Sequence, residues 1–361
     1  PSARSRELQE AAQKALADAK KEASPAGRAA LYEKALTRLS TAWAKMLFDH
    51  GTQAAAHPKL GPTLRWGLTL DETFASRVSD FDSIAKKLGT SGANWVRLVF
   101  RQNPDDFAYA NARSFLEYDA AIAALKRQKL HIMASVLDST LWPRGLDPKQ
   151  ASARARNLVM RYQETIRSWE VASEPNGTWL GGRRGGLSQD AIVSSIQSMA
   201  SEVKRIARSL ETVATLYWWE GTAGDDVHPT FAWARRAAAE GAFREIDVVG
   251  LSIYPDDNPM GLAFDTTFRR LHQSLPDKRL LVGGFGYVEG KALEGYWWLE
   301  PGDVDGARKD LLILYTGAAP SVPSTLGGGF WWSTLSTMLD GSRESESVLR
   351  IYKRTAQRLG R

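Results

Sequence analysis

The chain of 361 residues contains no cysteine, which excludes disulfides, a cysteine nucleophile and any zinc site with cysteine ligands. It has five histidines, and none of them stands at a metal-ligand spacing or in a His-Glu-x-x-His motif. The Gly-x-Ser-x-Gly motif of a serine nucleophile elbow is also missing. We therefore expect chemistry that needs no metal and no cofactor.

Long apolar runs are absent too, and none approaches the roughly 18 residues that a membrane-spanning helix needs. Apolar residues make up 43% of the chain and charged residues 24%, which is typical of a folded globular protein and excludes a disordered one. The net charge of +6 is spread over predicted helices rather than gathered in a basic run. With no nucleic-acid-binding motif either, we expect no nucleic-acid partner and no transmembrane segment.

The compartment is indicated only weakly. No signal peptide is visible in the chain, which begins at Pro1 without a methionine. A protein without cysteine avoids stray disulfides in an oxidising compartment. We expect an exported protein, periplasmic or extracellular.

Residues 1–56 differ from the rest of the chain and predict an N-terminal helical extension. Arg6 to Ala23 is rich in alanine, lysine, glutamate and glutamine, and Ser24-Pro25 is a typical start for a second helix. Apolar residues then recur at helical spacing until Gly51, which predicts the end of that helix. The stripe either packs on the main domain, which we favour, or serves as a tether or partner-binding coil.

From Leu64 onward, short β-prone runs alternate with amphipathic helices, so residues 57–361 are expected to form one domain. Eight strand-and-helix units with nearly continuous apolar strands predict a (β/α)8 TIM barrel, of class α/β. A doubly wound sheet would need a glycine-rich phosphate turn after its first strand, and none is present. The predicted strands are Leu64–Leu70, Ala93–Phe100, Leu130–Leu137, Ile166–Ala172, Thr212–Trp218, Ile246–Tyr254, Arg279–Phe285 and Gly328–Trp332.

The end of the fourth predicted strand carries the clearest motif. It reads Trp-Glu-Val-Ala-Ser-Glu-Pro-Asn over residues 169–176, with Glu174 where the strand opens into a loop. Active sites of such barrels lie at these strand ends, and a carboxylic acid there can protonate a leaving oxygen. The motif resembles that of the retaining glycoside hydrolases with TIM-barrel folds, such as families 5 and 39. That resemblance implies a general acid/base role for Glu174.

Other strand ends match the same clan. The resemblance implies that Arg97, on the second strand, orients the nucleophile, and that Tyr254, on the sixth, places its hydroxyl beside it. Ser173 stands where the clan usually has an asparagine that binds the sugar 2-hydroxyl, and a serine can make one such bond rather than two. Asn176 adds a polar group at the same rim.

Position 284 departs from the clan. The seventh strand ends Gly-Gly-Phe-Gly over residues 283–286, where clan members have Glu-Phe-Gly or Glu-Tyr-Gly and use that glutamate as the nucleophile. A retaining mechanism needs two carboxylates about 5–5.5 Å apart, and Gly284 supplies none. Three explanations stay open: the glutamate was replaced by design, the protein has lost hydrolysis and only binds glycans, or Glu220 or Glu289 takes its place.

Tryptophans gather at the predicted strand ends, where they suit the stacking of sugar rings. The resemblance implies that Trp331 or Trp332 forms the floor of the site, and alternation along the strand lets only one of them face it. We also expect sugar contacts from Trp218, Trp297 and Trp298. Together these features predict a retaining β-glycoside hydrolase acting on an oligosaccharide or polysaccharide. The alternatives are a silent glycan-binding barrel and a transglycosylase that remodels an exopolysaccharide.

Overall fold

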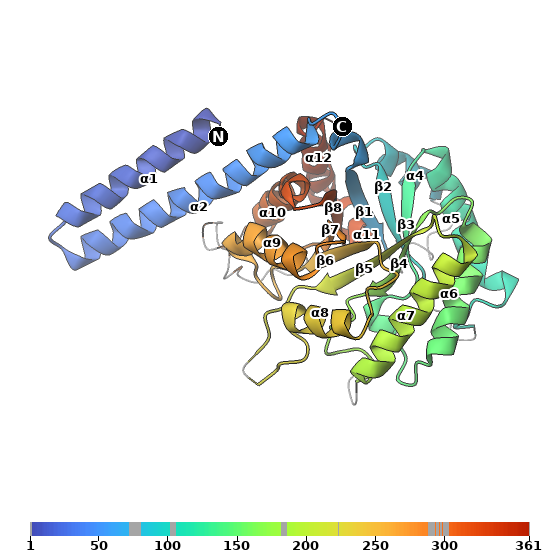
Figure 1. The fold of residues 1–361 in the computed structure, drawn as a ribbon. Helices are drawn as coiled ribbons and strands as arrows, with labels where there is room; N and C mark the ends of the chain where they lie inside the picture. Colours follow the sequence, from blue (N-terminus) through green and yellow to red (C-terminus); the bar gives the residue numbers. More distant parts are fainter. Residues whose placement is uncertain are drawn as a thin grey trace.

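A computed structural model describes residues 2–71, 81–101, 106–181, 186–222, 224–287, 293, 296, 298 and 303–360. Within these ranges eight parallel strands close into a barrel in the order β1 to β8, which confirms the predicted (β/α)8 fold (Figure 1). The strands are β1 (Arg65–Leu70), β2 (Trp95–Val99), β3 (His131–Ser135), β4 (Ser168–Ser173), β5 (Glu211–Tyr217), β6 (Val248–Ile253), β7 (Arg279–Phe285) and β8 (Thr325–Trp331).

Two N-terminal helices precede the barrel, and the later helices cover its outside (Figure 1). Among the helices described, none combines the length and apolar character that a membrane crossing requires. The helices are α1 (Ala3–Lys21), α2 (Pro25–Ala55), α4 (Phe81–Gly89), α5 (Leu116–Arg127), α6 (Pro148–Tyr162), α7 (Gln189–Ile206), α8 (Thr230–Ala239), α9 (Phe264–Ser274), α10 (Val304–Ala318), α11 (Thr334–Met338) and α12 (Arg343–Arg358).

The strands β1, β4 and β8 are buried throughout because each is covered on two faces. One face packs against the helices in a large outer cluster. The other fills the barrel interior, so the barrel is a packed core rather than a channel. The interior cluster consists of Met133, Val213, Val248, Leu281, Leu326 and Phe330.

Two strand boundaries differ from the prediction in ways that matter for the site. β8 begins at Thr325 and ends at Trp331, whereas the sequence predicted Gly328–Trp332, so Trp332 is the first residue of the loop. β5 ends at Tyr217, one residue before the predicted end at Trp218. Side chains alternate between faces along a strand, so a shift of one residue at its end changes which aromatic ring faces the cavity.

The helix α2 does not end at Gly51, as the sequence predicted, but continues to Ala55. A Cβ at Gly51 would lie 1.7 Å from the carbonyl oxygen of Gly317 in α10, so both glycines allow a close helix contact. Figure 1 shows that the α1–α2 hairpin projects away from the barrel and that only its end reaches it. The glycine therefore serves helix packing and does not terminate the helix.

We expect Gly51→Ala to destabilise the protein by about 1–3 kcal/mol, because its methyl group would collide with backbone that cannot move aside cheaply. Urea denaturation measures the change. Gly145→Ala is the matched control, since a Cβ at Gly145 meets nothing within 4 Å. Equal stability of the two variants would contradict this account of the contact.

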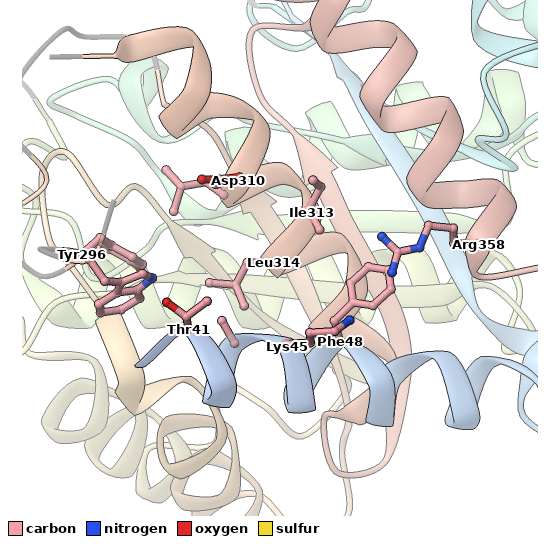
Figure 2. Close-up of a pocket in the computed structure, with 11 residues that line it drawn as sticks. Thr41, Lys45, Phe48, Tyr296, Asp310, Ile313, Leu314 and Arg358 are labelled. Carbon is pink, nitrogen blue, oxygen red and sulfur yellow. The ribbon is translucent and has the colours of Figure 1, made fainter. Parts of the chain in front are cut away.

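A cavity of about 290 Å³ lies between α2 and α10 (Figure 2). It is largely apolar, and Phe48 on its wall carries the Arg358 guanidinium 4.3 Å above its ring. This cavity is on the outside of the barrel and holds no residue from a strand end. Its lining residues are Thr41, Ala44, Lys45, Phe48, Tyr296, Trp298, Asp310, Leu311, Ile313, Leu314 and Arg358.

Candidate active site

A second cavity, of about 310 Å³, opens at the carboxyl ends of the strands. Its walls come from β2, β4 and β5 and from the loops after β3, β4, β6 and β8. Unlike the outer cavity, it is lined mainly by polar and aromatic side chains. They are Arg97, Asp138, Ser139, Thr140, Ser173, Glu174, Trp179, Tyr217, Tyr254, Asp257 and Trp332.

Glu174 directly follows β4 and is only 8% exposed. Its backbone lies in the left-handed region, at φ 48°, and its amide donates to the Thr215 carbonyl at 2.7 Å. Its carboxylate accepts a hydrogen bond of 2.9 Å from the Ser139 hydroxyl. A non-glycine residue in this region costs about 1–3 kcal/mol, and such strain clusters at functional sites.

The environment of Glu174 keeps it partly protonated at neutral pH. Burial raises its pKa to about 7, and the negative charge of Asp138 acts in the same direction. Arg97 and the hydroxyls of Ser139 and Ser252 oppose the shift without cancelling it. A carboxyl group with a pKa near the working pH can both donate and accept a proton, which is the requirement for general acid/base catalysis.

Arg97, on β2, is 1% exposed and is held by a buried partner on β4, two strands along the barrel. Its Nε and Nη2 donate to the same Glu170 oxygen at 2.9 and 2.7 Å, and Nη2 also donates to Ser173 at 3.1 Å. The other Glu170 oxygen accepts from Thr215 at 2.6 Å. The pairing of β4 with β5 shifts register between Glu170 and Ala172, which lets Glu170 and Ser173 face the same arginine.

The two glycines of β7 have different surroundings. A Cβ at Gly283 would lie 2.4 Å from the Thr215 methyl group, so a side chain there would collide with the packed interior. A Cβ at Gly284 would meet only ordinary contacts: 3.4 Å to the Ser252 hydroxyl, 3.5 Å to that of Tyr254 and 3.9 Å to Arg97 Nη1. A side chain at 284 would thus point at two residues that line the cavity beside Glu174.

The paired tryptophans at the end of β8 face different ways. Trp332 lines the cavity, and the Arg97 guanidinium carbon lies 5.1 Å from its ring centre. Trp331 is fully buried and donates its indole N–H to Thr337 at 2.7 Å. Ser333, with φ 55°, turns the chain sharply after the pair. Of these two tryptophans, only Trp332 therefore offers its ring to a ligand.

A second polar cluster lines the same cavity. The Tyr217 hydroxyl donates to the Asp257 carboxylate and accepts from the Asn258 amide at 2.7 Å. Burial, with the Asp257 charge, raises the pKa of this hydroxyl well above its usual value. The Trp179 ring stands edge-on to Tyr217, with ring centres 4.9 Å apart. The polar groups of Tyr217 and Asp257 can bind hydroxyl groups of a ligand, and the Trp179 ring lies beside them.

The structure gathers part of the predicted site. Arg97, Ser173, Glu174, Tyr254 and Trp332 line one cavity, and a side chain at position 284 would point toward it.

The remaining predicted residues lie elsewhere. Asn176 is fully buried and uses its amide for backbone bonds to Tyr217 and His228. Trp218 packs edge-on against Phe231, with ring centres 6.1 Å apart. Trp298 lines the outer cavity under α2. Trp297 lies outside the described residues.

Sequence reasoning left out Ser139, Tyr217, Glu170 and Ser252. Ser252 precedes Tyr254 by two residues on β6, so alternation along the strand would have placed it on the same face. Tyr217 needed the exact end of β5, and Glu170 needed the register shift in β4. Glu220, considered as a substitute nucleophile, is exposed and does not line the cavity, and Glu289 lies outside the described residues.

No protein-family model and no curated protein matches the sequence. Solved structures do match. A β-glucosidase from Thermotoga maritima is 12% identical, covers 75% of this chain and 88% of its own, and has a TM-score of 0.54. A glucosidase from Croceicoccus marinus is 14% identical, with 76% and 63% covered and a TM-score of 0.55.

An exo-β-1,4-mannosidase from Opitutaceae bacterium strain TAV5 is 12% identical, covers 82% of this chain and 60% of its own, and has a TM-score of 0.54. At such low identity these likenesses concern the fold. The chain therefore has the closed (β/α)8 barrel found in these three glycoside hydrolases.

Proposed function

We propose that the cavity at the strand ends binds a β-linked oligosaccharide or polysaccharide, and that the chain is a glycoside hydrolase whose nucleophile position is occupied by Gly284. The observation that carries this proposal is the pairing of two features. Glu174 is a buried carboxyl group with a pKa of about 7, and position 284 points at Tyr254 and Arg97 in the same cavity. The three structural neighbours described above are glycosidases.

In this proposal Glu174 acts as acid and then as base. Its protonated form gives a proton to the glycosidic oxygen as the bond to the sugar breaks, and its carboxylate then takes a proton from the incoming water. Its raised pKa suits both steps. The Ser139 hydroxyl holds the carboxyl group in place.

The attacking group is what this chain lacks. A retaining enzyme places a second carboxylate about 5–5.5 Å from the acid. Glu170 does not serve, because it is fully buried and both of its oxygens are hydrogen-bonded. We propose that a glutamate at 284 would take the retaining position, since Tyr254, Ser252 and Arg97 already surround it.

Gly284 itself favours a second candidate, a barrel that binds glycans without cleaving them. A transglycosylase would use the same acid and differ only in its acceptor. A polysaccharide ligand also fits an exported protein, periplasmic or extracellular, and fractionation of the native cells would test that location.

Sugar binding can be tested without assuming catalysis. We expect Trp332→Ala to weaken oligosaccharide binding by about 2 kcal/mol, roughly 30-fold, because its ring is the aromatic face beside Arg97. Isothermal titration calorimetry measures the affinity. Trp219→Ala is the matched control, since Trp219 is also half-buried but does not line the cavity. Equal affinity of both variants would refute the role of Trp332.

A further inference from the structure

The space over Gly284 is lined by polar groups that face it from two other strands. The Ser252 hydroxyl is fully buried and makes no hydrogen bond of normal geometry among the residues described. It faces the Glu174 carboxyl group and the Tyr254 hydroxyl, and it lowers the pKa of both. It would lie 3.4 Å from a Cβ at 284, with the Tyr254 hydroxyl at 3.5 Å and Arg97 Nη1 at 3.9 Å. A buried hydroxyl without a well-formed hydrogen bond is costly, so a ligand atom that accepts one from Ser252 would be stabilised there.

The charges around this space suit a neutral acceptor. The Arg97 charge is already compensated by Glu170, which it contacts through two nitrogens. Glu174 already experiences the negative charge of Asp138. A carboxylate in this space would raise the pKa of Glu174 further, whereas the oxygen of an amide can accept hydrogen bonds without adding a charge.

A substituent of the sugar has nearly as many heavy atoms as the side chain that is missing at 284. A glutamate side chain at 284 would contribute five heavy atoms, and the 2-acetamido group of an amino sugar contributes four, ending in a similar planar unit. That group is attached next to the anomeric carbon, so its carbonyl oxygen can reach the face from which a nucleophile attacks. Substrate-assisted glycosidases use such a group in place of an enzyme carboxylate.

We propose that the sugar bound beside Glu174 carries a 2-acetamido group, and that its carbonyl oxygen lies over Gly284 and supplies the missing nucleophile. This inference rests on the proposed function, because it assigns Glu174 the same role. Ser252 and Tyr254 are positioning residues that orient the acetamido group by hydrogen bonds.

The proposed step balances within the substrate and Glu174. The carbonyl oxygen forms a bond to the anomeric carbon, while the bond to the leaving oxygen breaks and its electron pair takes the proton from Glu174. The product is an oxazolinium ion. Water then attacks the anomeric carbon and gives a proton to Glu174. The bond between the anomeric carbon and the acetamido oxygen breaks, which restores the acetamido group and the original anomeric configuration.

The test uses the unaltered chain with aryl β-glycosides of glucose, galactose and their 2-acetamido counterparts. We expect turnover of a 2-acetamido substrate and none of the 2-hydroxy substrates. Replacing the acetyl group by mono-, di- and trifluoroacetyl should lower kcat stepwise, because fluorine weakens the attacking oxygen. The inference would be overturned if 2-hydroxy substrates were turned over as fast as 2-acetamido substrates, or if fluorination of the acetyl group left kcat unchanged.

Binding gives a second readout that does not depend on turnover. The thiazoline analogue of the 2-acetamido sugar should bind, and Ser252→Ala should weaken its binding by roughly fivefold through one lost hydrogen bond. Ser195→Ala is the matched control, a buried serine in α7 that likewise makes no hydrogen bond of normal geometry among the described residues. Equal affinities for the two variants would place the acetamido group elsewhere and overturn the inference.

The two proposals can fail separately. If the unaltered chain neither binds the thiazoline nor cleaves a 2-acetamido substrate, while Gly284→Glu cleaves 2-hydroxy substrates, this inference is wrong and the proposed function stands. If neither protein cleaves any β-glycoside, both are wrong.

Discussion

Gly284→Glu is expected to give the chain hydrolysis of 2-hydroxy β-glycosides, with kcat/KM raised roughly a thousandfold or more over the unaltered protein. A Cβ at 284 meets only ordinary contacts, so the glutamate needs no rearrangement of the backbone. Its carboxylate would form a covalent intermediate and so divide one difficult step into two easier ones. Initial rates on aryl β-glucosides, β-galactosides and β-mannosides measure the gain.

Gly284→Gln is the control for this prediction, because it fills the same space without a carboxylate. Proton NMR of the first-formed product should show retention of the anomeric configuration for the glutamate variant. With an α-glycosyl fluoride as donor, the unaltered chain should form β-linked products, since the fluoride mimics the missing intermediate. A folded, sugar-binding Gly284→Glu that is no faster than Gly284→Gln would contradict the mechanism proposed for position 284.

Glu174→Gln is expected to lower kcat of the Gly284→Glu variant by about 10²–10⁴-fold on substrates whose leaving group needs a proton. Glutamine keeps the shape but holds no proton to give. The rate of Gly284→Glu itself should fall as the pH rises past the pKa of Glu174, and Glu174→Gln should lack that limb. The nearby carboxylate at 284 raises this pKa above its value of about 7 in the unaltered chain. Aryl leaving groups that depart without protonation should be affected least.

The same residue predicts a pH dependence of stability in the unaltered chain. The pKa of Glu174 is raised from 4.5 to about 7, so between these values the folded protein keeps a proton that the unfolded chain has lost. The free energy of unfolding should therefore fall by about 3 kcal/mol as the pH rises through this window. Glu174→Gln should remove this loss, as measured by urea denaturation at pH 4.5 and pH 8. If the free energy of unfolding of the unaltered chain and of Glu174→Gln changed with pH in the same way, Glu174 would not be buried as described.

The sequence by itself determined the architecture. Eight apolar runs separated by amphipathic helices predicted the closed barrel, because a parallel strand buried on two faces must be apolar throughout. Positions at strand ends were also predictable, since every parallel strand of a barrel ends at the same mouth. Glu174 and Arg97 were therefore placed at one site before any coordinates.

Sequence reasoning was less reliable within one residue of a strand end. It did not decide between Trp331 and Trp332, and it placed Trp218 on β5, where Tyr217 is the last residue and lines the cavity. Hydrophobic patterns locate a strand, but burial of its last residue depends on the neighbouring loop and on the register of the adjacent strand.

The tertiary structure alone decided which polar groups meet. The register shift in β4 brings Glu170 and Ser173 to the same arginine, and a Cβ at Gly284, unlike one at Gly283, would meet only ordinary contacts. Asn176, which sequence reasoning assigned to the sugar, instead binds backbone at the end of β5. Periodicity along one chain fixes the face of each element, whereas a hydrogen bond depends on distances between elements, and these are set only when the barrel closes.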